Sequence, residues 1–499
     1  MSPVPERLPY DWARRHGLLR LPDAAEDSSP RLLMRQGASA TALLELRRQA
    51  GAALAWDTVD EATFERELAD AYAQPSLSPD SEDLARSSAL DSLLEELPAA
   101  ADLLAGQDDA PVIRLINGLI AEGVRQGASD IHIEPGEESL RVRLRVDGLL
   151  RTAAQLPPRL APLLVSRVEV MARLDIAERR LPQDGRISVR LGNRPLDVRV
   201  SCLPARGGER VVLRLLDKQA GILQLDQLGL SPTVDARLRA ALAQPNGIIL
   251  VTGPTGSGKT TTLYAALAAL NDGQRNLLTV EDPVEYAIDG IGQTQVNAKV
   301  GMSFAAGLRA ILRQDPDVVM VGEIRDAETT QIAIQASLTG HLVLSTVHTN
   351  HAVGAITRLR DMGSEAFLLA SCVRLVLAQR LVRRLCPHCA VPGQADDPLA
   401  RRLFAGQAVP AHRIGRGCAA CQHTGYSGRL ALHEALSVDE GLRRLIIDGA
   451  DEDRLARHAF AQGGRLLDAG QAAVRAGLTC AGEVLRVTGE DASDTRQAT

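Results

Sequence analysis

A glycine-rich loop between an apolar run and a helical pattern constrains this chain more than any other feature. The run Gly247–Val251 leads into the sequence GPTGSGKTT, which occupies residues 253–261. Glycines in such a loop let backbone N–H groups turn toward a phosphate chain at the positive end of the following helix. The pattern is a P-loop, and it predicts that the chain binds a nucleoside triphosphate.

Each residue type in the loop has a chemical task. We expect Lys259 to reach the outer phosphates as a point charge and Thr260 to hold Mg²⁺ through its hydroxyl. A chance glycine-rich turn is the weaker alternative, because a predicted strand and helix flank the loop. The expected phosphate-binding residues are Gly253, Pro254, Thr255, Gly256, Ser257, Gly258, Lys259, Thr260 and Thr261.

Length and composition narrow the class of protein. A chain of 499 residues has room for three or four domains. The net charge of −6 and the aromatic content of 2% argue against a protein that mainly binds nucleic acid. The sequence has neither an apolar run long enough to span a bilayer nor a secretory signal, so we expect a cytoplasmic protein.

Changes in composition divide the chain into segments of an α/β multidomain protein. Residues 111–222 alternate in the manner of strands, and residues 223–380 alternate strand and helix like a parallel sheet covered on both faces. The other predicted segments are an N-terminal helical domain (1–75, with amphipathic helices over 43–73), an acidic flexible linker (76–110), a four-cysteine element (381–430) and a helical C-terminal domain with a disordered tail (431–499).

Acidic residues stand at the ends of two predicted strands. Glu323 follows the run Val318–Val321, and Glu281 follows Leu277–Val280. In an open parallel sheet the ligand lies beyond the carboxyl ends of the strands, so we expect both carboxylates near the phosphates. There they would suit metal-assisted phosphoryl transfer to water. For Glu281, capping of the turn before Pro283 is an alternative.

Two histidines and two arginines are further candidates for contact with the phosphates. His341 and His348 stand at the two ends of another predicted strand, and either a phosphate-sensing or a structural role is open for them. Arg199 and Arg214 share one face of the strands in the second domain. That face is either a source of cationic partners for a triphosphate or a solvated surface.

Four cysteines form two CxxC pairs. Cys386, Cys389, Cys418 and Cys421 together offer the four thiolates of a closed, structural Zn²⁺ site, whereas a redox dithiol would need only one pair. The arginines just before the cluster are expected on a solvated helix face, with a subunit contact as the alternative; they are Arg374, Arg380, Arg383 and Arg384.

Four motifs occur in the order found in secretion and pilus-assembly traffic ATPases, which the chain resembles. They are Walker A (GPTGSGKTTTLYA), an aspartate-rich box (RNLLTVEDPVEY), Walker B (RQDPDVVMVGEIRD) and a histidine box (TGHLVLSTVHTN). The phrases QDGRISVRLG, GERVVLRLLDK and GLRAILRQDPD are most similar to type II secretion ATPases of the GspE family. The resemblance covers roughly residues 110–490, and Gly322 departs from the many P-loop proteins with aspartate there.

The resemblance implies a RecA-like ATPase domain preceded by a PAS-like α+β domain, with a zinc-binding insertion. It implies ATP, Mg²⁺ and Zn²⁺ as cofactors, and assembly as a homohexamer. Catalytic or sensing roles would fall to Lys259, Glu323, Glu281, His341 and His348, while Arg199 and Arg214 would complete the nucleotide site.

The same resemblance implies a cytoplasmic ATPase, peripheral to the inner membrane, that couples ATP hydrolysis to pseudopilus assembly and protein export. The N-terminal domain would bind the cytosolic part of a GspL-type membrane protein, with a GspF-type platform protein as a further partner. The membrane would be contacted only indirectly, and nucleic acid not at all. The alternatives are a type IV pilus assembly ATPase and, from another class, a nucleic-acid-dependent RecA-like motor.

Overall fold

The computed structural model describes two compact units of the chain, Met1–Ala220 and Gly221–Thr499. The residues described are 8, 10–20, 31–50, 55–61, 63–64, 67–68, 110–191, 194–217, 223–405 and 407–489. The expected acidic linker, apart from Ala110, and the expected disordered tail beyond residue 489 lie outside them. Each unit is described by itself.

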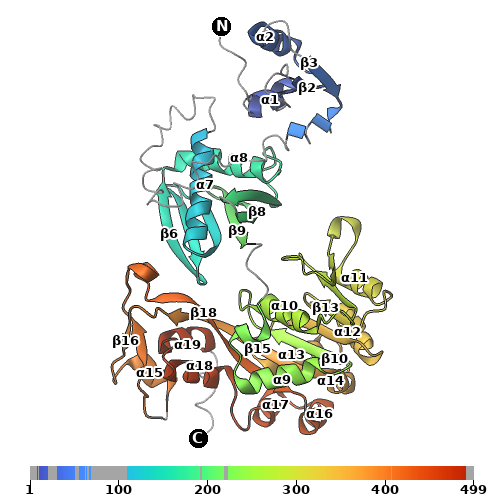
Figure 1. The fold of residues 1–499 in the computed structure, drawn as a ribbon, viewed down its shortest axis with the longest axis vertical. Helices are drawn as coiled ribbons and strands as arrows, with labels where there is room; N and C mark the ends of the chain where they lie inside the picture. Colours follow the sequence, from blue (N-terminus) through green and yellow to red (C-terminus); the bar gives the residue numbers. More distant parts are fainter. Residues whose placement is uncertain are drawn as a thin grey trace. The chain divides into compact units, whose positions relative to one another are not determined.

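Unit 1 begins with a small mixed domain rather than a helical one. Its elements are α1 (Tyr10–His16), β1 (Leu18–Arg20), β2 (Arg31–Arg35), α2 (Ala40–Ala50) and β3 (Ala55–Val59) (Figure 1). Strand β2 pairs antiparallel with β1 and parallel with β3. The prediction of a purely helical domain is therefore wrong, because it missed these three strands. Helical residues on both sides of β3, in α2 and at 61, 63–64 and 67–68, agree with the two helices expected over residues 43–73. The β2–α2–β3 crossover buries apolar residues of strands and helix together, which local helical periodicity does not reveal.

The second domain of unit 1 is a six-stranded antiparallel sheet covered by two helices. The strand order is β6-β5-β4-β9-β8-β7, and apolar residues of both helices pack on one face. Arg199 on β8 and Arg214 on β9 are directly paired, which confirms that they share one face of the sheet. The elements are α7 (Ala110–Arg125), β4 (Ala128–Pro135), β5 (Leu140–Val146), β6 (Leu149–Leu156), α8 (Ala161–Met171), β7 (Gln183–Leu191), β8 (Arg194–Ala205) and β9 (Gly208–Asp217).

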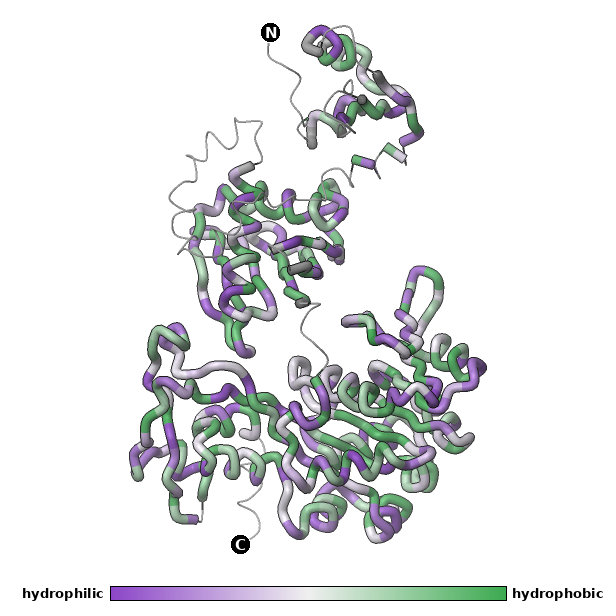
Figure 2. Tube along the Cα trace, viewed as in Figure 1, coloured by the Kyte–Doolittle hydropathy of each residue, from purple (hydrophilic) through white to green (hydrophobic). Residues whose placement is uncertain are grey.

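Unit 2 is built on a seven-stranded sheet of order β12-β11-β13-β14-β10-β15-β18, parallel except for β18. Residues of β10, β13 and β14 are buried throughout, and the centre of the sheet is hydrophobic in Figure 2. Fully buried parallel strands of this kind confirm the predicted sheet. The strands are β10 (Gly247–Thr252), β11 (Leu277–Glu281), β12 (Ile291–Gln295), β13 (Val318–Val321), β14 (Leu342–Val347), β15 (Val373–Leu385) and β18 (Tyr426–Ser437).

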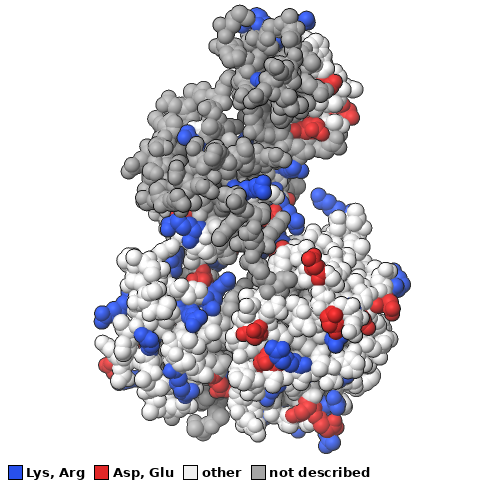
Figure 3. Space-filling view, viewed as in Figure 1, with Lys and Arg blue, Asp and Glu red and all other residues white. Residues whose placement is uncertain are grey.

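The surface of unit 2 carries charges of both signs. In Figure 3 basic and acidic side chains are both scattered over the visible face. Among the helices that the structure describes, none combines the length and the apolar character needed to cross a bilayer.

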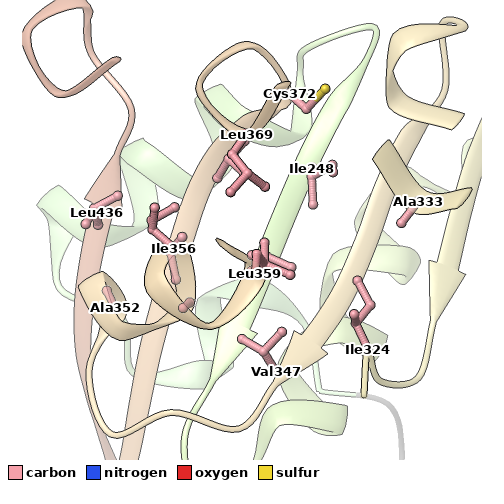
Figure 4. Close-up of a cluster of buried hydrophobic side chains, with 14 of the residues drawn as sticks. Ile248, Ile324, Ala333, Val347, Ala352, Ile356, Leu359, Leu369, Cys372 and Leu436 are labelled. Carbon is pink, nitrogen blue, oxygen red and sulfur yellow. The ribbon is translucent and has the colours of Figure 1, made fainter. Parts of the chain in front are cut away.

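Helices cover both faces of this sheet. On one face α9 (Pro232–Leu242) and α10 (Lys259–Leu270) pack against alternate strand residues such as Ile249 and Val251. The other face buries Ile248 and Leu250 beneath the remaining core helices, as Figure 4 shows around Ile248 and Leu369. These helices are α11 (Phe304–Ile311), α12 (Ala327–Leu338), α13 (Ala352–Asp361), α14 (Ala366–Cys372), α16 (Glu440–Ile447), α17 (Glu452–Ala459) and α18 (Leu466–Arg475).

Strand β15 joins the centre of the sheet to the cysteine element. Its residues include the four arginines expected on a helix face, so that prediction is wrong, and Arg380 is only 8% exposed. Tight pairing with β10 and β18 outweighs the helical pattern of this segment. After β15 come β16 (Ala390–Pro392), α15 (Pro398–Leu403) and β17 (Arg413–Gly415), and α19 (Ala481–Thr488) packs on α15.

Candidate functional site

The P-loop connects the carboxyl end of β10 to the first turn of α10. Gly253, Gly256 and Gly258 have φ angles of +143°, +79° and +90°, which L-residues with side chains rarely adopt. At Gly253 a Cβ atom would also collide with the carbonyl oxygen of Gln379. Pro254, Thr255, Gly256 and Thr260 are exposed or half-buried, so this part of the loop is open to a ligand.

Lys259 folds back onto the loop in this structure. Its Nζ donates to the carbonyl oxygens of Gly253 at 2.8 Å and Pro254 at 3.1 Å. Burial lowers the pKa of Lys259 to about 8, while the Glu323 carboxylate opposes that shift. A triphosphate would replace these neutral carbonyl partners with charged ones, which an ammonium group prefers.

Glu323 and His348 lie just beyond the carboxyl ends of the adjacent strands β13 and β14. Oε2 of Glu323 is 3.6 Å from Nε2 of His348, and the Glu323 side chain is 12% exposed. Arg325 forms an ion pair with the other oxygen of this carboxylate. Burial, and next the charge of Lys259, lower the pKa of His348, whereas Glu323 acts in the opposite direction. Lys259, Glu323, Arg325 and His348 therefore form one electrostatic cluster beside the P-loop.

His341 is not part of this cluster. It precedes β14, and its carbonyl oxygen accepts from the N–H of Gly247, the first residue of β10. Because β10 and β14 run parallel from Gly247–Leu342 to Thr252–Val347, His341 lies at the amino end of the sheet, about 17 Å of strand away from the P-loop. Its Nδ1 instead contacts the carbonyl oxygen of Ala336 at 2.9 Å. The expectation that His341 senses phosphate does not fit this placement.

Glu281 ends β11 but its carboxylate turns into the interior. The residue is 3% exposed, and its oxygens accept hydrogen bonds from the hydroxyls of Tyr264 and Thr279 and from Nε2 of Gln293 at 3.1 Å. This arrangement fits neither of the two expected roles of Glu281, a contact with the nucleotide or a cap of the turn before Pro283. The carboxylate links β11 to α10, the helix that begins with Lys259.

One of the two arginines expected from unit 1, Arg214, contacts an aspartate, and Arg145 lies near the same carboxylate. Nε of Arg214 donates to Oδ1 of Asp130 at 3.0 Å, and Arg145 lies 3.7 Å from Oδ2. Arg199 pairs directly with Arg214 across β8 and β9. The second domain thus presents a group of cations held on one buried carboxylate.

Two residues near the P-loop were not predicted from the sequence. Arg325 belongs to the quoted Walker B segment, and its position two residues after Glu323 was a usable signal. Gln379 contacts the P-loop from β15, far along the chain, and no local pattern marks it.

The four cysteines of the two CxxC pairs come together at the end of β15. Their sulfur atoms all lie within 4.8 Å of one another, with Sγ–Sγ distances of 3.9 Å for Cys386–Cys418, 3.7 Å for Cys389–Cys421 and 3.8 Å for Cys418–Cys421. A tetrahedral Zn²⁺ site with Zn–S bonds of about 2.3 Å has sulfur–sulfur edges of about 3.8 Å. The cluster is compatible with zinc in both ligand type and geometry.

Known proteins resemble the chain along most of its length. The family model of the type II/IV secretion system protein matches residues 105–486, and that of an amino-terminal domain of GSPII protein E matches residues 7–72. The type II secretion system protein E of Pseudomonas aeruginosa is 54% identical over 98% of this chain and 97% of its own. The type II secretion system ATPase E of Vibrio cholerae is 53% identical, over 97% of each chain.

Solved structures share the fold. The pilus retraction motor PilT with bound ADP is similar at a TM-score of 0.51 and 28% identity, covering 74% of this chain and 95% of its own. The ATPase DotB of Legionella pneumophila has a TM-score of 0.56 at 22% identity, covering 76% and 96%. The expected RecA-like core, with a further α+β domain before it, is confirmed.

Proposed function

The chain belongs to the type II secretion system protein E family of secretion ATPases, and from this premise we propose that its P-loop hydrolyses ATP to drive protein export. The single observation that carries the proposal is the cluster of Lys259, Glu323 and His348 at the carboxyl ends of neighbouring strands. A ligand beyond these strand ends meets a cation, a carboxylate and an imidazole at once.

The residues have distinct roles in this proposal. Lys259 would leave the loop carbonyls and pair with the outer phosphates. The exposed Thr260 hydroxyl would hold Mg²⁺, which would supply charge neutralisation. The carboxylate of Glu323 orients and polarises the attacking water, and His348 contacts the terminal phosphate. Glu281 positions α10 through Tyr264 and has no direct chemical step.

The proposal also assigns roles to the arginines of the second domain, to the four cysteines and to the N-terminal domain. Arg199 and Arg214 would supply positive charge to the triphosphate, as the family resemblance implies, and Arg214 would then exchange its bond to Asp130 for phosphate. The four thiolates of Cys386, Cys389, Cys418 and Cys421 would hold Zn²⁺ as a structural element. The protein works as a cytosolic homohexamer at the inner membrane, held there by its N-terminal domain on a GspL-type partner and next to a GspF-type platform. It thereby powers assembly of a pseudopilus.

A type IV pilus assembly ATPase is the second candidate, and the likeness to the pilus retraction motor PilT favours keeping it. The curated relatives bearing the type II secretion name weigh more, because they match at 51–54% identity over nearly the whole chain. A nucleic-acid motor finds no support in the mixed surface charge of unit 2.

The deciding experiment is genetic. The gene is deleted in its source cell and replaced by wild type or by Lys259→Ala, and secreted enzymes and surface pili are measured in parallel. We expect enzymes trapped inside cells that carry Lys259→Ala while pili persist. Normal secretion with lost pili would overturn the secretion assignment and move the protein to the pilus branch. Stimulation of ATP hydrolysis by DNA or RNA would instead revive the nucleic-acid motor.

A further inference from the structure

Gln379 contacts the P-loop from the neighbouring strand. It is 3% exposed and lies on β15 directly after Ala378, which pairs with Thr252 at the end of β10. Its Oε1 accepts from the hydroxyl of Thr262 at 2.7 Å, and its Nε2 donates to the carbonyl oxygen of Ser257 at 2.8 Å. One side chain therefore ties together the last part of the loop and the first turn of α10.

The hydrogen-bonding partners determine which end of the Gln379 amide is the oxygen and which is the nitrogen. The Ser257 carbonyl can only accept a hydrogen bond, so the NH₂ end of Gln379 must face it, and the carbonyl end is left for the Thr262 hydroxyl. Thr262 is 1% exposed, which leaves this hydroxyl no solvent alternative. Both bonds are buried, and the loss of either leaves a polar group without a partner.

The bond to Ser257 sets the direction of a phosphate-facing group. The carbonyl of Ser257 and the N–H of Gly258 belong to one planar trans peptide, in which C=O and N–H point in opposite directions. By holding the carbonyl toward β15, Gln379 aims the N–H of Gly258 to the other side of the loop. The Gly258 backbone has a φ of +90°, so without this anchor the peptide has other orientations within easy reach.

The close fit at Gly258 agrees with this role. A Cβ atom on Gly258 would lie 2.8 Å from Nε2 of Gln379, so glycine is required there to admit the amide. We propose that Gln379 is a positioning residue of the nucleotide site, which preorganises the Ser257–Gly258 peptide for the triphosphate through paired bonds to Ser257 and Thr262. This inference rests on the proposed function, since it assumes that the loop binds ATP.

The test uses the full chain and two near-isosteric variants, Gln379→Met and Thr262→Val. Binding of a fluorescent ATP analogue with Mg²⁺ is titrated, and kcat and KM for ATP are measured. We expect Gln379→Met to raise Kd and KM about tenfold, since two buried hydrogen bonds are lost, with kcat within about threefold of wild type. Thr262→Val should raise Kd less. The double variant should bind no more weakly than Gln379→Met alone, because both act through one amide.

A matched control separates positioning from general packing. His433 is the cross-strand neighbour of Gln379 and similarly buried, with no hydrogen bond to the P-loop among the described residues. His433→Leu should leave Kd for the analogue unchanged. A lower melting temperature of Gln379→Met with wild-type Kd and KM would overturn the inference and leave ATP binding standing. Failure of wild type itself to bind the analogue would instead overturn the proposed function.

Discussion

The carboxylate of Glu323 lies 3.6 Å from the imidazole of His348, and both groups stand beyond the ends of adjacent strands, β13 and β14. Burial and the positive charge of Lys259 lower the pKa of His348, so the imidazole is neutral at pH 7 before nucleotide binds. The pair thus offers an anionic acceptor for water beside a neutral ring that can donate to phosphate.

Replacing Glu323 by glutamine should abolish turnover while binding survives. Glu323→Gln keeps the size of the side chain but removes the charge that polarises water. We expect hydrolysis to fall by about 10²–10⁴-fold, the usual worth of a general base, with Kd for ATP changed little. Phosphate release and equilibrium titration measure the two quantities. Wild-type hydrolysis by Glu323→Gln would show that another group activates the water.

The two histidines of the histidine box should differ sharply. His348 lies in the cluster with Glu323 and Lys259, whereas His341 lies at the amino end of the sheet. We expect His348→Ala to lower kcat at least about tenfold and His341→Ala to leave kcat within about twofold. Steady-state assays on both variants decide this, with melting curves to allow for lost stability. Equal defects would contradict the placement of His341 away from the nucleotide.

ATP affinity should weaken above pH 8. Burial lowers the pKa of Lys259 to about 8, so the free protein loses this positive charge as the pH rises through that value. Triphosphate binding favours the charged form, and Kd should therefore rise by up to about tenfold per pH unit above 8 and stay flat just below it. Lys259→Arg provides the control, because a guanidinium remains charged throughout. A flat wild-type profile from about pH 7 to 9.5 would contradict the shift.

Glu169 should make the protein less stable at neutral pH and above than at acidic pH. This residue of α8 is fully buried, and its carboxyl group faces that of Glu209. Burial, followed by the charge of Glu209, raises its pKa to about 7. Because the folded state holds the proton more tightly than the unfolded state, stability is full below the ordinary pKa near 4.5 and falls as the pH rises toward 7.

Replacing Glu169 by glutamine should prevent this loss of stability as the pH rises. We expect the variant to be more stable than wild type by about 2–3 kcal/mol at pH 8 and nearly equal at pH 5, measured by denaturant unfolding. Glu137→Gln, the same substitution on the exposed surface, serves as the control. Equal differences at both pH values would point to packing rather than ionisation.

Removing one sulfur ligand should empty the cysteine cluster. Cys418→Ser leaves three thiolates, and we expect about one bound zinc per wild-type chain to fall toward zero in the variant, measured by elemental analysis. His388→Ala, next to the cluster in sequence, should keep its metal. Full zinc in Cys418→Ser would contradict a four-thiolate site.

Local sequence patterns were sufficient to predict the P-loop, the strands around it and the cysteine cluster. Strand-end positions predicted Glu323 beside the P-loop, because a parallel sheet gathers the carboxyl ends of its strands. The same rule places His341 at the opposite end of the sheet, because it precedes its strand, but both ends of the strand had been treated as candidates. The position of Glu281 at the end of a strand was predicted correctly. Its side chain, however, points to the face of the sheet covered by α10, where the carboxylate contacts Tyr264. Gln379 could not be predicted, because its role depends on pairing between distant strands.

Strand β15 connects the cysteine cluster directly to the neighbourhood of the P-loop. It runs from residues paired with β10 beside the P-loop to Leu385, the residue before the first zinc-ligand candidate Cys386, with β18 paired along its length. A paired strand neither stretches nor folds between its ends. A force applied to the cysteine cluster would therefore be transmitted along the backbone of β15 to the residues beside the P-loop.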